Sequence, residues 1–281
     1  MRLLTFNIAH GRGLGLYHGW QSESALRRNL DRIAALLSEA DADVVALQEV
    51  DVESHWNHRL NLLEYLREAG GYPYAELAAT NRRSGMKPLL YGNGMLSRWP
   101  IGHWEALRFD QKTIWGKGLL WAEIAMPGGV RLPVLNLHLD FASRRKRVAQ
   151  VEEVIELLHR KAQGWQEVQG HDGAPNVASA DGDTANRAAT PLLDPIICGD
   201  FNARDANSRD AVRHLRHHLP GDAGYRIEPR RARTFPSVMP TRGIDFVFVP
   251  ACVDLVDTQV LTTYTSDHRP VLVELTGAHL P

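Results

Sequence analysis

The sequence predicts a single α/β domain, and three observations support this prediction. Segments with strand-like and helix-like hydrophobic patterns alternate along almost the whole chain. The chain has 281 residues, a length at which one large domain buries a sizeable core. Hydrophobic residues make up 44% and charged residues 23%, which is ordinary globular composition. No linker separates two cores in the pattern, so we expect one domain over residues 1–281.

The first part of the chain predicts alternating strands and helices. Residues 3–8 form an apolar run typical of a strand. Residues 24–39 place apolar side chains three and four positions apart, which marks one face of a helix that Ser22 or Ser24 would cap. A short buried-type strand follows at 44–50, and residues 58–69 have a helical pattern.

The remainder begins with a β-rich region. Proline and glycine signals separate short strands at residues 89–97, 101–109, 114–125 and 130–137. A helix is predicted at 143–163. Residues 164–191 are rich in Gly, Ala, Asp and Asn, so we expect an exposed, flexible loop there. The last predicted elements are a strand at 193–198, a helix at 206–218 and strands at 243–249, 252–263 and 270–275.

Charge and hydropathy restrict the function. The formal net charge is -1, so any basic surface that attracts a polyanion must be local. No apolar run reaches the roughly 18 residues of a membrane-spanning helix, and no signal-peptide pattern opens the chain. We therefore expect a cytoplasmic protein. Cys198 and Cys252 lie in apolar, strand-like runs, and we interpret both as buried side chains.

Polar side chains repeatedly follow the ends of apolar strands, where a sheet presents them without breaking its core. The sharpest pair is Asp200 and Asn202 after Gly199, because two oxygen-bearing side chains two positions apart on an extended segment point the same way. This geometry suits a hard cation and an attacking water. The full set is Asn7, Glu49, His138, Asp140, Asp200, Asn202, Asp245, Asp267 and His268.

Each member has an ordinary structural alternative when it is taken alone. Asn7 would be a turn former, Glu49 a solvated strand end, and His138 a partner of a backbone carbonyl. The Asp200–Asn202 pair would be an Asx turn. Asp245 would cap a strand entry, and Asp267 with His268 would form a polar turn. The common order and strand context of all members make the functional interpretation the stronger one.

In these residues the sequence resembles the endonuclease/exonuclease/phosphatase family, which has the DNase I-like fold. The matching stretches are TFNIAHG, VVALQEVD, YGNGMLSRWPI, LNLHLD, IICGDFNA, RGIDFVFV and TSDHRPVLVEL, which together span residues 5–275. The resemblance implies an α/β (α+β) fold in which two β-sheets pack as a two-layer sandwich flanked by helices. It also implies a phosphoester substrate, and Mg²⁺ or Mn²⁺ as the cofactor, in agreement with the oxygen-rich ligand set.

The resemblance also implies roles for the residues. Asn7, Glu49 and Asp267 would bind or orient the metal. Asp200 and Asn202 would position or deprotonate the attacking water. His138 would stabilise the phosphoryl oxygens, and Asp245 would orient His268. No role follows for Asp140.

Other polar segments are weaker candidates. The glycines at 11, 13 and 15 do not have dinucleotide-binding spacing, although His10 and Arg12 between them are candidates for substrate contact. The His214 and His218 pair is interpreted as a solvated helix face rather than a zinc site. Four arginines flank the predicted strand at 243–249 and are candidates for binding substrate charge: Arg230, Arg231, Arg233 and Arg242.

The substrate class is the open part of this prediction. The near-neutral net charge disfavours a nuclease of long duplexes, so a small or lipid-derived phosphodiester is favoured. A nuclease acting on DNA or RNA is the alternative. A non-catalytic binding module on the same fold is the third hypothesis, and it is disfavoured because none of the expected site positions is lost.

Overall fold

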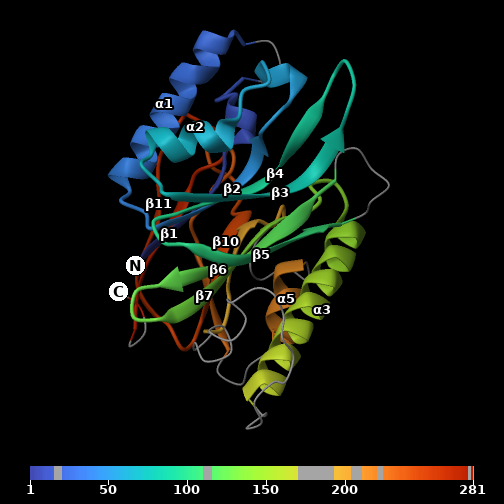
Figure 1. Ribbon diagram of the computed structural model, residues 1–281, viewed down its shortest axis with the longest axis vertical. Coiled ribbons are helices and arrows are strands. Elements are labelled where there is room, and N and C mark those ends of the chain that lie inside the picture. The colour runs from blue at the N-terminus through green and yellow to red at the C-terminus, as the bar shows by residue number, and fades with distance from the viewer. Residues whose placement is uncertain are drawn as a thin grey trace, which may run out of the picture.

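Two six-stranded β-sheets form the centre of the protein, and helices cover their outer faces (Figure 1). This arrangement confirms the predicted two-layer sandwich with flanking helices. The computed structural model describes residues 1–15, 21–109, 116–169, 193–203, 211–219, 224–277 and 280. None of the helices in these segments is long and apolar enough to cross a membrane.

The first sheet has the strand order β11-β12-β1-β2-β4-β3, and the second has the order β5-β6-β7-β8-β10-β9. The strands of the first sheet are β1 (Arg2–Asn7), β2 (Val44–Asp51), β3 (Tyr74–Arg83), β4 (Leu89–Ser97), β11 (Asp254–Val260) and β12 (Val271–Thr276). Those of the second are β5 (Ile101–Arg108), β6 (Gly118–Met126), β7 (Val130–His138), β8 (Ile196–Asp200), β9 (Tyr225–Glu228) and β10 (Asp245–Pro250). Pairing is parallel between β1 and β2 and between β7 and β8. The carboxyl ends of both pairs therefore present their polar residues together.

Two helices pack on each sheet. On the first sheet lie α1 (Glu23–Glu39) and α2 (Leu62–Ala69), and on the second lie α3 (Arg144–Gln169) and α5 (Ala211–His218). Ser22 caps α1, because its side chain accepts a hydrogen bond from the Ala25 amide at 3.2 Å. Short 3₁₀ turns, η1 (Ala9–Gly11) and η2 (His55–Asn57), connect the strand ends to the helices of the first sheet.

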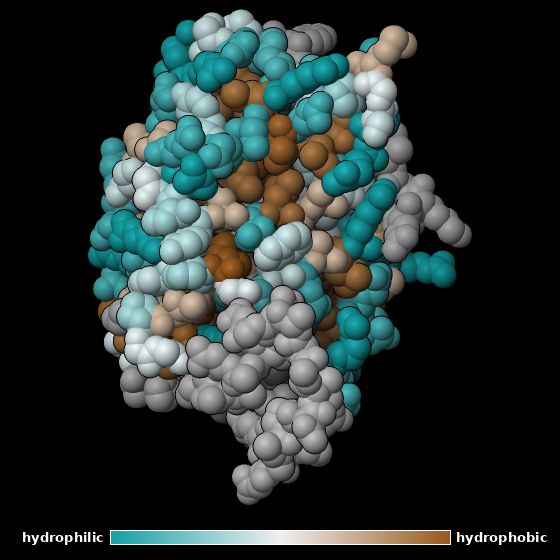
Figure 2. All heavy atoms as spheres, in the orientation of Figure 1, coloured by the Kyte–Doolittle hydropathy of each residue, from teal (hydrophilic) through white to brown (hydrophobic). Residues whose placement is uncertain are grey.

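Apolar side chains fill three layers. One layer lies between the two sheets and contains Leu3 and Ala46 from the first and Leu120 and Val247 from the second. The other two layers lie between each sheet and its helices. On the face shown in Figure 2, hydrophobic residues gather in the middle and hydrophilic residues surround them. Within each central strand, alternate residues face the sheet interface and a helix. Nearly all central strands therefore have continuous apolar sequences.

A polar network interrupts the layer between the sheets. Asn136 on β7 donates from Nδ2 to the carbonyls of Leu47 and Gly94, at 2.9 Å each, and accepts from Gln48 Nε2 at 2.7 Å. Asn93 on β4 donates to the Asn136 carbonyl at 3.2 Å. Buried amides are stabilising only when they are paired, and here they tie β2 and β4 of one sheet to β7 of the other.

Several sequence-based boundaries differ from the structure. The helix predicted at 58–69 begins at Leu62, because His58 and Arg59 have φ values of 54° and 59°, outside the helical region. The helix predicted to end at 163 continues to Gln169, so the first residues of the predicted 164–191 loop are helical. Residues 170–191, and residues 206–210 of another predicted helix, lie outside the described residues.

Two strands and one cysteine were also misjudged. β3 and β9 were not predicted, because β3 is half exposed and β9 has only four residues. Cys198 is buried as predicted, but Cys252 is exposed in the turn between β10 and β11.

Candidate active site

A β-bulge in β2 places Glu49. The register of β2 against β4 shifts between Leu47 and Val50, and Glu49 has φ of 56°. A bulge re-aims a side chain that a regular strand would direct elsewhere. Glu49 remains 21% exposed, while its neighbour Gln48 is fully buried between the sheets. The carboxylate of Glu49 therefore opens toward the strand ends instead of the core.

Three cationic or imidazole groups face Glu49. Lys117 Nζ lies 3.3 Å from Oε1, His10 Nε2 lies 3.5 Å from Oε2, and His138 Nε2 lies 3.9 Å from Oε1. Burial alone would raise the pKa of Glu49, but Lys117 and the histidines hold it well below its usual value. The carboxylate is consequently ionised at neutral pH.

Asp200 is the centre of the site, at the carboxyl end of β8 and 1% exposed. Its Oδ2 accepts from Asn7 Nδ2 at 3.0 Å and from Asn202 Nδ2 at 3.3 Å, and its Oδ1 accepts from the Asn202 amide at 2.9 Å. Burial raises the pKa of Asp200 to about 7, and Asp245 adds to this effect while His268 opposes it. Asp200 thus links β1 of the first sheet to β8 of the second.

Backbone conformation at β8 explains why this segment carries Gly199. Its φ is 136°, and a Cβ atom at this position would lie 1.9 Å from the Leu137 carbonyl oxygen. Only glycine allows β7 and β8 to approach so closely. Asn202 has φ of 49° and donates from Nδ2 to the Leu139 carbonyl at 3.0 Å. The backbone at Gly199 and Asn202 thus fixes the direction of the Asp200 side chain.

His138 ends β7 and is buried beside Lys117. Its Nε2 lies 2.8 Å from Lys117 Nζ and 3.4 Å from Asp200 Oδ2. Burial and the charge of Lys117 lower the pKa of His138 well below its usual value, although Glu49 opposes this shift. His138 is therefore a neutral imidazole beside the amino group of Lys117.

His268 and Asp245 form a second buried pair. His268 Nδ1 lies 3.0 Å and 3.1 Å from the two carboxylate oxygens of Asp245, and its Nε2 lies 3.7 Å from Asp200 Oδ2. Burial alone would lower the pKa of His268, but Asp245 and Asp200 raise it to about 10. Asp245 and Asp200 are directly opposed in the β10–β8 pairing, which explains how one imidazole reaches both carboxylates.

Asp267 lies at the same edge but is engaged by other side chains. Its Oδ2 accepts from Arg12 Nη2 at 2.6 Å, and Ser266 Oγ lies 3.4 Å from its Oδ1. Ser266 Oγ also donates to the Asn7 carbonyl at 2.6 Å and accepts from the His268 amide at 3.1 Å. One serine therefore joins the segment before β12 to the end of β1.

His10 belongs to a separate buried network behind Glu49. Its Nδ1 donates to Asp51 Oδ2 at 2.8 Å, and Asn57 Nδ2 donates to the same oxygen at 2.5 Å. Trp56 Nε1 donates to Asp51 Oδ1 at 3.2 Å. Burial would lower the pKa of His10, but Asp51 and Glu49 raise it above its usual value.

The structure assigns a local role to Asp140. Its Oδ1 accepts from the amides of Ala142 and Ser143 at 2.9 Å and 2.7 Å, just before α3. Gln150 on α3 accepts from the Asp140 amide at 2.8 Å, and Arg147 donates to its carbonyl at 3.1 Å. Asp140 therefore stabilises the turn into α3 and contacts none of the groups around Asp200 described above.

Apart from Asp140, the predicted residues fall into three groups. Asn7, His138, Asn202 and His268 surround Asp200, and Asp245 contacts His268. Glu49 lies beside His138. Asp267 is joined to the cluster through Ser266. The predicted residues from both sheets therefore gather at one edge of the sandwich.

Two residues near Glu49 were missed by the sequence prediction. Lys117 was not among the predicted residues, although a lysine between two glycines before a buried strand was a usable signal. Asp51 is fully buried at the end of β2, and an unpaired carboxylate there would be costly. Asp51 could have been found by the same strand-end criterion that identified Glu49, whereas Lys117 lies before its strand.

Two sets of side chains offer metal ligands. Asp200, Asp245 and His268 bring three ligand atoms within 4.8 Å of one another. This set is a poor metal site, because His268 is held as a cation by two carboxylates and a metal needs neutral imidazole. Glu49 and Asp267, with the amide oxygen of Asn7, offer oxygen ligands, and both carboxylates already attract cationic side chains. Oxygen donors of this kind are the ligands that a hard divalent cation prefers, although the Asn7 oxygen already accepts from the Ala9 amide at 3.0 Å.

Comparisons with known proteins show a family match and the same fold. The profile of the Endonuclease/Exonuclease/phosphatase family matches residues 4–268. The uncharacterized protein YbhP of Escherichia coli (strain K12) is 26% identical over 250 residues, which is 83% of each chain. Among solved structures, the mannosyl-6-phosphatase of Bacteroides thetaiotaomicron VPI-5482 is similar with a TM-score of 0.64 at 17% identity, covering 98% of this chain and 99% of that one. TDP2 of D. rerio, complexed with single strand DNA product, is similar with a TM-score of 0.62 at 18% identity, covering 98% of both chains.

Proposed function

Because this chain belongs to the endonuclease/exonuclease/phosphatase family, we propose that it is a divalent-metal-dependent phosphoesterase that uses water as the nucleophile. The observation that carries the proposal is the convergence of polar side chains from both sheets on Asp200. Burying this many polar groups together is costly unless the arrangement has a use. In-line attack on phosphorus requires the three elements that this edge offers: a base, positive charge for the phosphoryl oxygens, and an acid.

Glu49 and Asp267, with the amide oxygen of Asn7, are the residues that would hold the metal ion. Bound there, Mg²⁺ or Mn²⁺ supplies Lewis acidity that neutralises charge on the phosphoryl group. Glu49 is suited to this role because it is ionised and aimed out of the core by the bulge. Arg12 pairs with Asp267 in the structure, and would either keep this contact beside the ion or move away when the ion binds.

Asp200 and Asn202 would position the attacking water and accept its proton. Both side chains are fixed, because Asp200 accepts three hydrogen bonds and Asn202 is anchored to the Leu139 carbonyl. A base that is already oriented loses little entropy when the reaction occurs. The pair therefore favours direct hydrolysis over a covalent enzyme intermediate.

His138 and Lys117 would bind the phosphoryl oxygens that carry the developing charge. Their nitrogen atoms lie 2.8 Å apart, and both are near Glu49. A neutral imidazole donates one hydrogen bond, and the lysine supplies a full positive charge.

His268 would act on the phosphoryl group from the other side of Asp200. Asp245 accepts from Nδ1 and helps to keep the ring cationic, so that Nε2 also carries a proton, which would face the substrate. This is the arrangement in which a carboxylate fixes the tautomer and charge of an imidazole.

Small chromogenic substrates test the proposal directly. We expect the purified protein to hydrolyse bis-p-nitrophenyl phosphate or p-nitrophenyl phosphate with Mg²⁺ or Mn²⁺, and to lose this activity with EDTA. Asp200→Asn should lower kcat by at least about 100-fold, the contribution of a positioned base. Glu156→Gln, an exposed change on α3, is the matched control. Equal rates for the wild type and Asp200→Asn on both substrates would refute the proposal.

Overall charge and the surroundings of the site favour different substrate classes. Overall charge favours a small or lipid-derived phosphodiester, and the two solved relatives described above act on or bind quite different phosphoesters. One specific observation favours the nuclease alternative, namely a groove lined by arginines next to the site. We therefore place single-stranded nucleic acid first among the substrates to be tested.

A further inference from the structure

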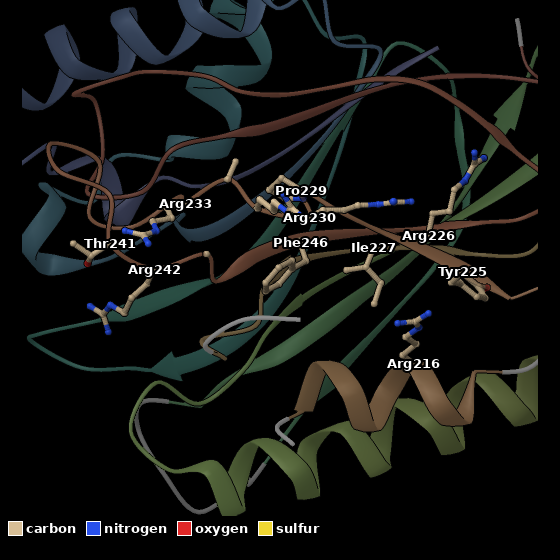
Figure 3. Close-up of a pocket in the computed structure, with 13 residues that line it drawn as sticks. Arg216, Tyr225, Arg226, Ile227, Pro229, Arg230, Arg233, Thr241, Arg242 and Phe246 are labelled. Atoms are coloured by element: carbon tan, nitrogen blue, oxygen red, sulfur yellow. The ribbon is translucent and has the colours of Figure 1, made fainter. Parts of the chain in front are cut away.

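A groove lined by arginine side chains lies on the outer face of β9 and β10 (Figure 3). Its volume is about 1020 Å³. The basic lining residues are Arg216, Arg226, Arg230, Arg231, Arg233 and Arg242, and we call this cavity the arginine groove. The net charge of the whole chain is -1, so this concentration of positive charge is a local feature.

Three elements form the walls of the arginine groove. α5 contributes Arg216, β9 contributes Arg226, and the segment between β9 and β10 contributes the other four. Phe246 and Ile227 lie in the middle of the lining (Figure 3). Phe246 is only 2% exposed and Ile227 8%, so a ligand in the groove would meet chiefly the charged margin.

The positive charge of the groove is poorly neutralised within the described residues. There, Arg230 pairs with Glu228 at 3.3 Å, and this is the one ion pair formed by the six arginines. Arg226 donates to the Val253 carbonyl, and Arg242 lies over the Phe235 ring at 4.5 Å. Several guanidinium groups gathered without carboxylates repel one another, so an anionic ligand would relieve a cost that the free protein bears.

The arginine groove begins beside the candidate active site. The Phe235 ring that carries Arg242 lies 4.9 Å from the His268 ring, centroid to centroid. Thr234, next to Phe235, accepts from the amide of Asp245 at 3.3 Å. From this end the groove follows β10 away from the site, because its far residue Tyr225 pairs with Pro250 at the other end of that strand. A ligand in the groove would thus be continuous with the reacting phosphate.

The arginines are spread along the groove rather than directed at one point. Figure 3 shows Arg233 and Arg242 at one end, and Arg216 and Arg226 at the other. A site for a compact polyphosphate would have guanidinium groups that converge on one point. An extended chain with phosphates at intervals fits the observed spread better.

We propose that the arginine groove binds the non-reacting phosphates of a single-stranded oligonucleotide, on one side of the phosphodiester held at Asp200. This proposal rests on the proposed phosphoesterase function, which makes Asp200 the place where the phosphodiester reacts. Binding to the groove is nevertheless measured without hydrolysis. The guanidinium groups would contact the phosphates of the strand.

The test is fluorescence anisotropy with 5′-fluorescein-labelled oligothymidylates of two, four and eight nucleotides in EDTA, over a series of KCl concentrations. The groove variant is Arg216→Gln, Arg231→Gln and Arg233→Gln combined. We expect it to weaken binding of the eight-nucleotide probe at least tenfold. The slope of log affinity against log salt should fall by about 2, since each phosphate contact with a single strand contributes about 0.7.

Two further variants separate charge placement from general charge and from folding. Arg28→Gln, Arg32→Gln and Arg160→Gln combined make the same charge change at exposed helix positions, and should alter affinity less than twofold. The corresponding Arg→Lys groove variant keeps the charge and should retain most of the salt slope. A groove variant with an unchanged slope, or a control variant that loses as much affinity, would overturn the proposal.

Competition identifies the ligand. myo-Inositol hexakisphosphate and linear inorganic polyphosphate are added to the complex with the eight-nucleotide probe. Weaker competition per phosphate than unlabelled oligothymidylate supports a nucleic-acid groove, and stronger competition by either compound overturns it. If the strand binds through the groove but no small phosphoester is hydrolysed with Mg²⁺ or Mn²⁺, the groove stands and the phosphoesterase proposal fails.

Discussion

Two buried histidines in this protein have nearly the same surroundings but differ in what they face. His268 places Nδ1 3.0 Å from Asp245 and Nε2 3.7 Å from Asp200, while His10 places Nδ1 2.8 Å from Asp51 and Nε2 3.5 Å from Glu49. In both cases carboxylates raise the pKa of an imidazole that burial would lower. The geometry of a histidine–carboxylate pair therefore does not by itself reveal a catalytic group.

The difference lies in the groups that surround each histidine and its aspartate. Asp51 also accepts from Trp56 and Asn57, and Asn57 donates to the His10 carbonyl at 2.8 Å, so the His10 ring is held in place with Nε2 facing Glu49. The rings of Trp56 and Tyr91 pack edge-on against His10. His268 instead faces Asp200, where water is proposed to react, and lies beside the Phe235 end of the arginine groove. We infer that His268 takes part in chemistry and that His10 positions Glu49.

The largest expected effect is at the His268 pair. His268→Ala should lower kcat on a small phosphoester by about 10²- to 10⁴-fold, because a positioned proton donor is lost. Asp245→Asn should cause most of the same loss, since it removes the charge that holds the ring. Steady-state rates at saturating Mg²⁺ measure both. Because the two residues act as a unit, the double variant should be hardly slower than either single variant. Multiplicative losses would contradict the pairing.

A smaller and different effect is expected at His10. His10→Gln keeps a polar side chain but loses the imidazole that faces Glu49. If Glu49 holds the metal, its orientation should suffer, and the Mg²⁺ concentration for half-maximal activity should rise about 10- to 100-fold. The rate at saturating Mg²⁺ should recover to within a few-fold of wild type. Loss of kcat without a change in Mg²⁺ dependence would place His10 in the chemistry and remove the distinction drawn above.

The sequence predicted the site better than it predicted these distinctions. Strand-end polar residues could be found because an apolar run that stops at Asn7, Glu49, His138 or Asp200 is a local pattern. Parallel pairing of β1 with β2, and of β7 with β8, then brings such ends together. The same argument predicted the alternation of strands and helices, and it failed for β3 and β9, whose side chains lack a clear apolar pattern.

Contacts between distant segments could not be predicted in this way. Arg12 meets Asp267 across 255 positions, and Lys117 meets Glu49 across 68. Lys117 reaches Glu49 only because β6 and β2 lie in different sheets that pack face to face. Four arginines of the groove were predicted as candidates from the sequence, but Arg216 and Arg226 join them only because α5 lies against β9. A single sequence contains no local signal for such proximity.

The smallest expected effect concerns stability and separates the two histidine networks again. Asn57→Ala removes the hydrogen bonds to Asp51 and to the His10 carbonyl, and leaves both acceptors buried. Asp51 keeps its bonds from His10 and Trp56, so the loss of the two Asn57 bonds should lower the free energy of unfolding by about 1–3 kcal/mol. Phe235→Leu beside His268 keeps an apolar contact at a half-buried position and should cost less than about 1 kcal/mol.

Urea denaturation of the two variants, followed by circular dichroism, measures this difference. A larger loss for Phe235→Leu than for Asn57→Ala would mean that the surroundings of His268 are the more tightly built. His268 would then belong to the structural framework as firmly as His10 does. We expect the larger loss of unfolding free energy in the network behind Glu49 and the smaller loss beside His268. A positioning residue such as His10 needs a rigid network, whereas a reacting residue such as His268 needs less constraint.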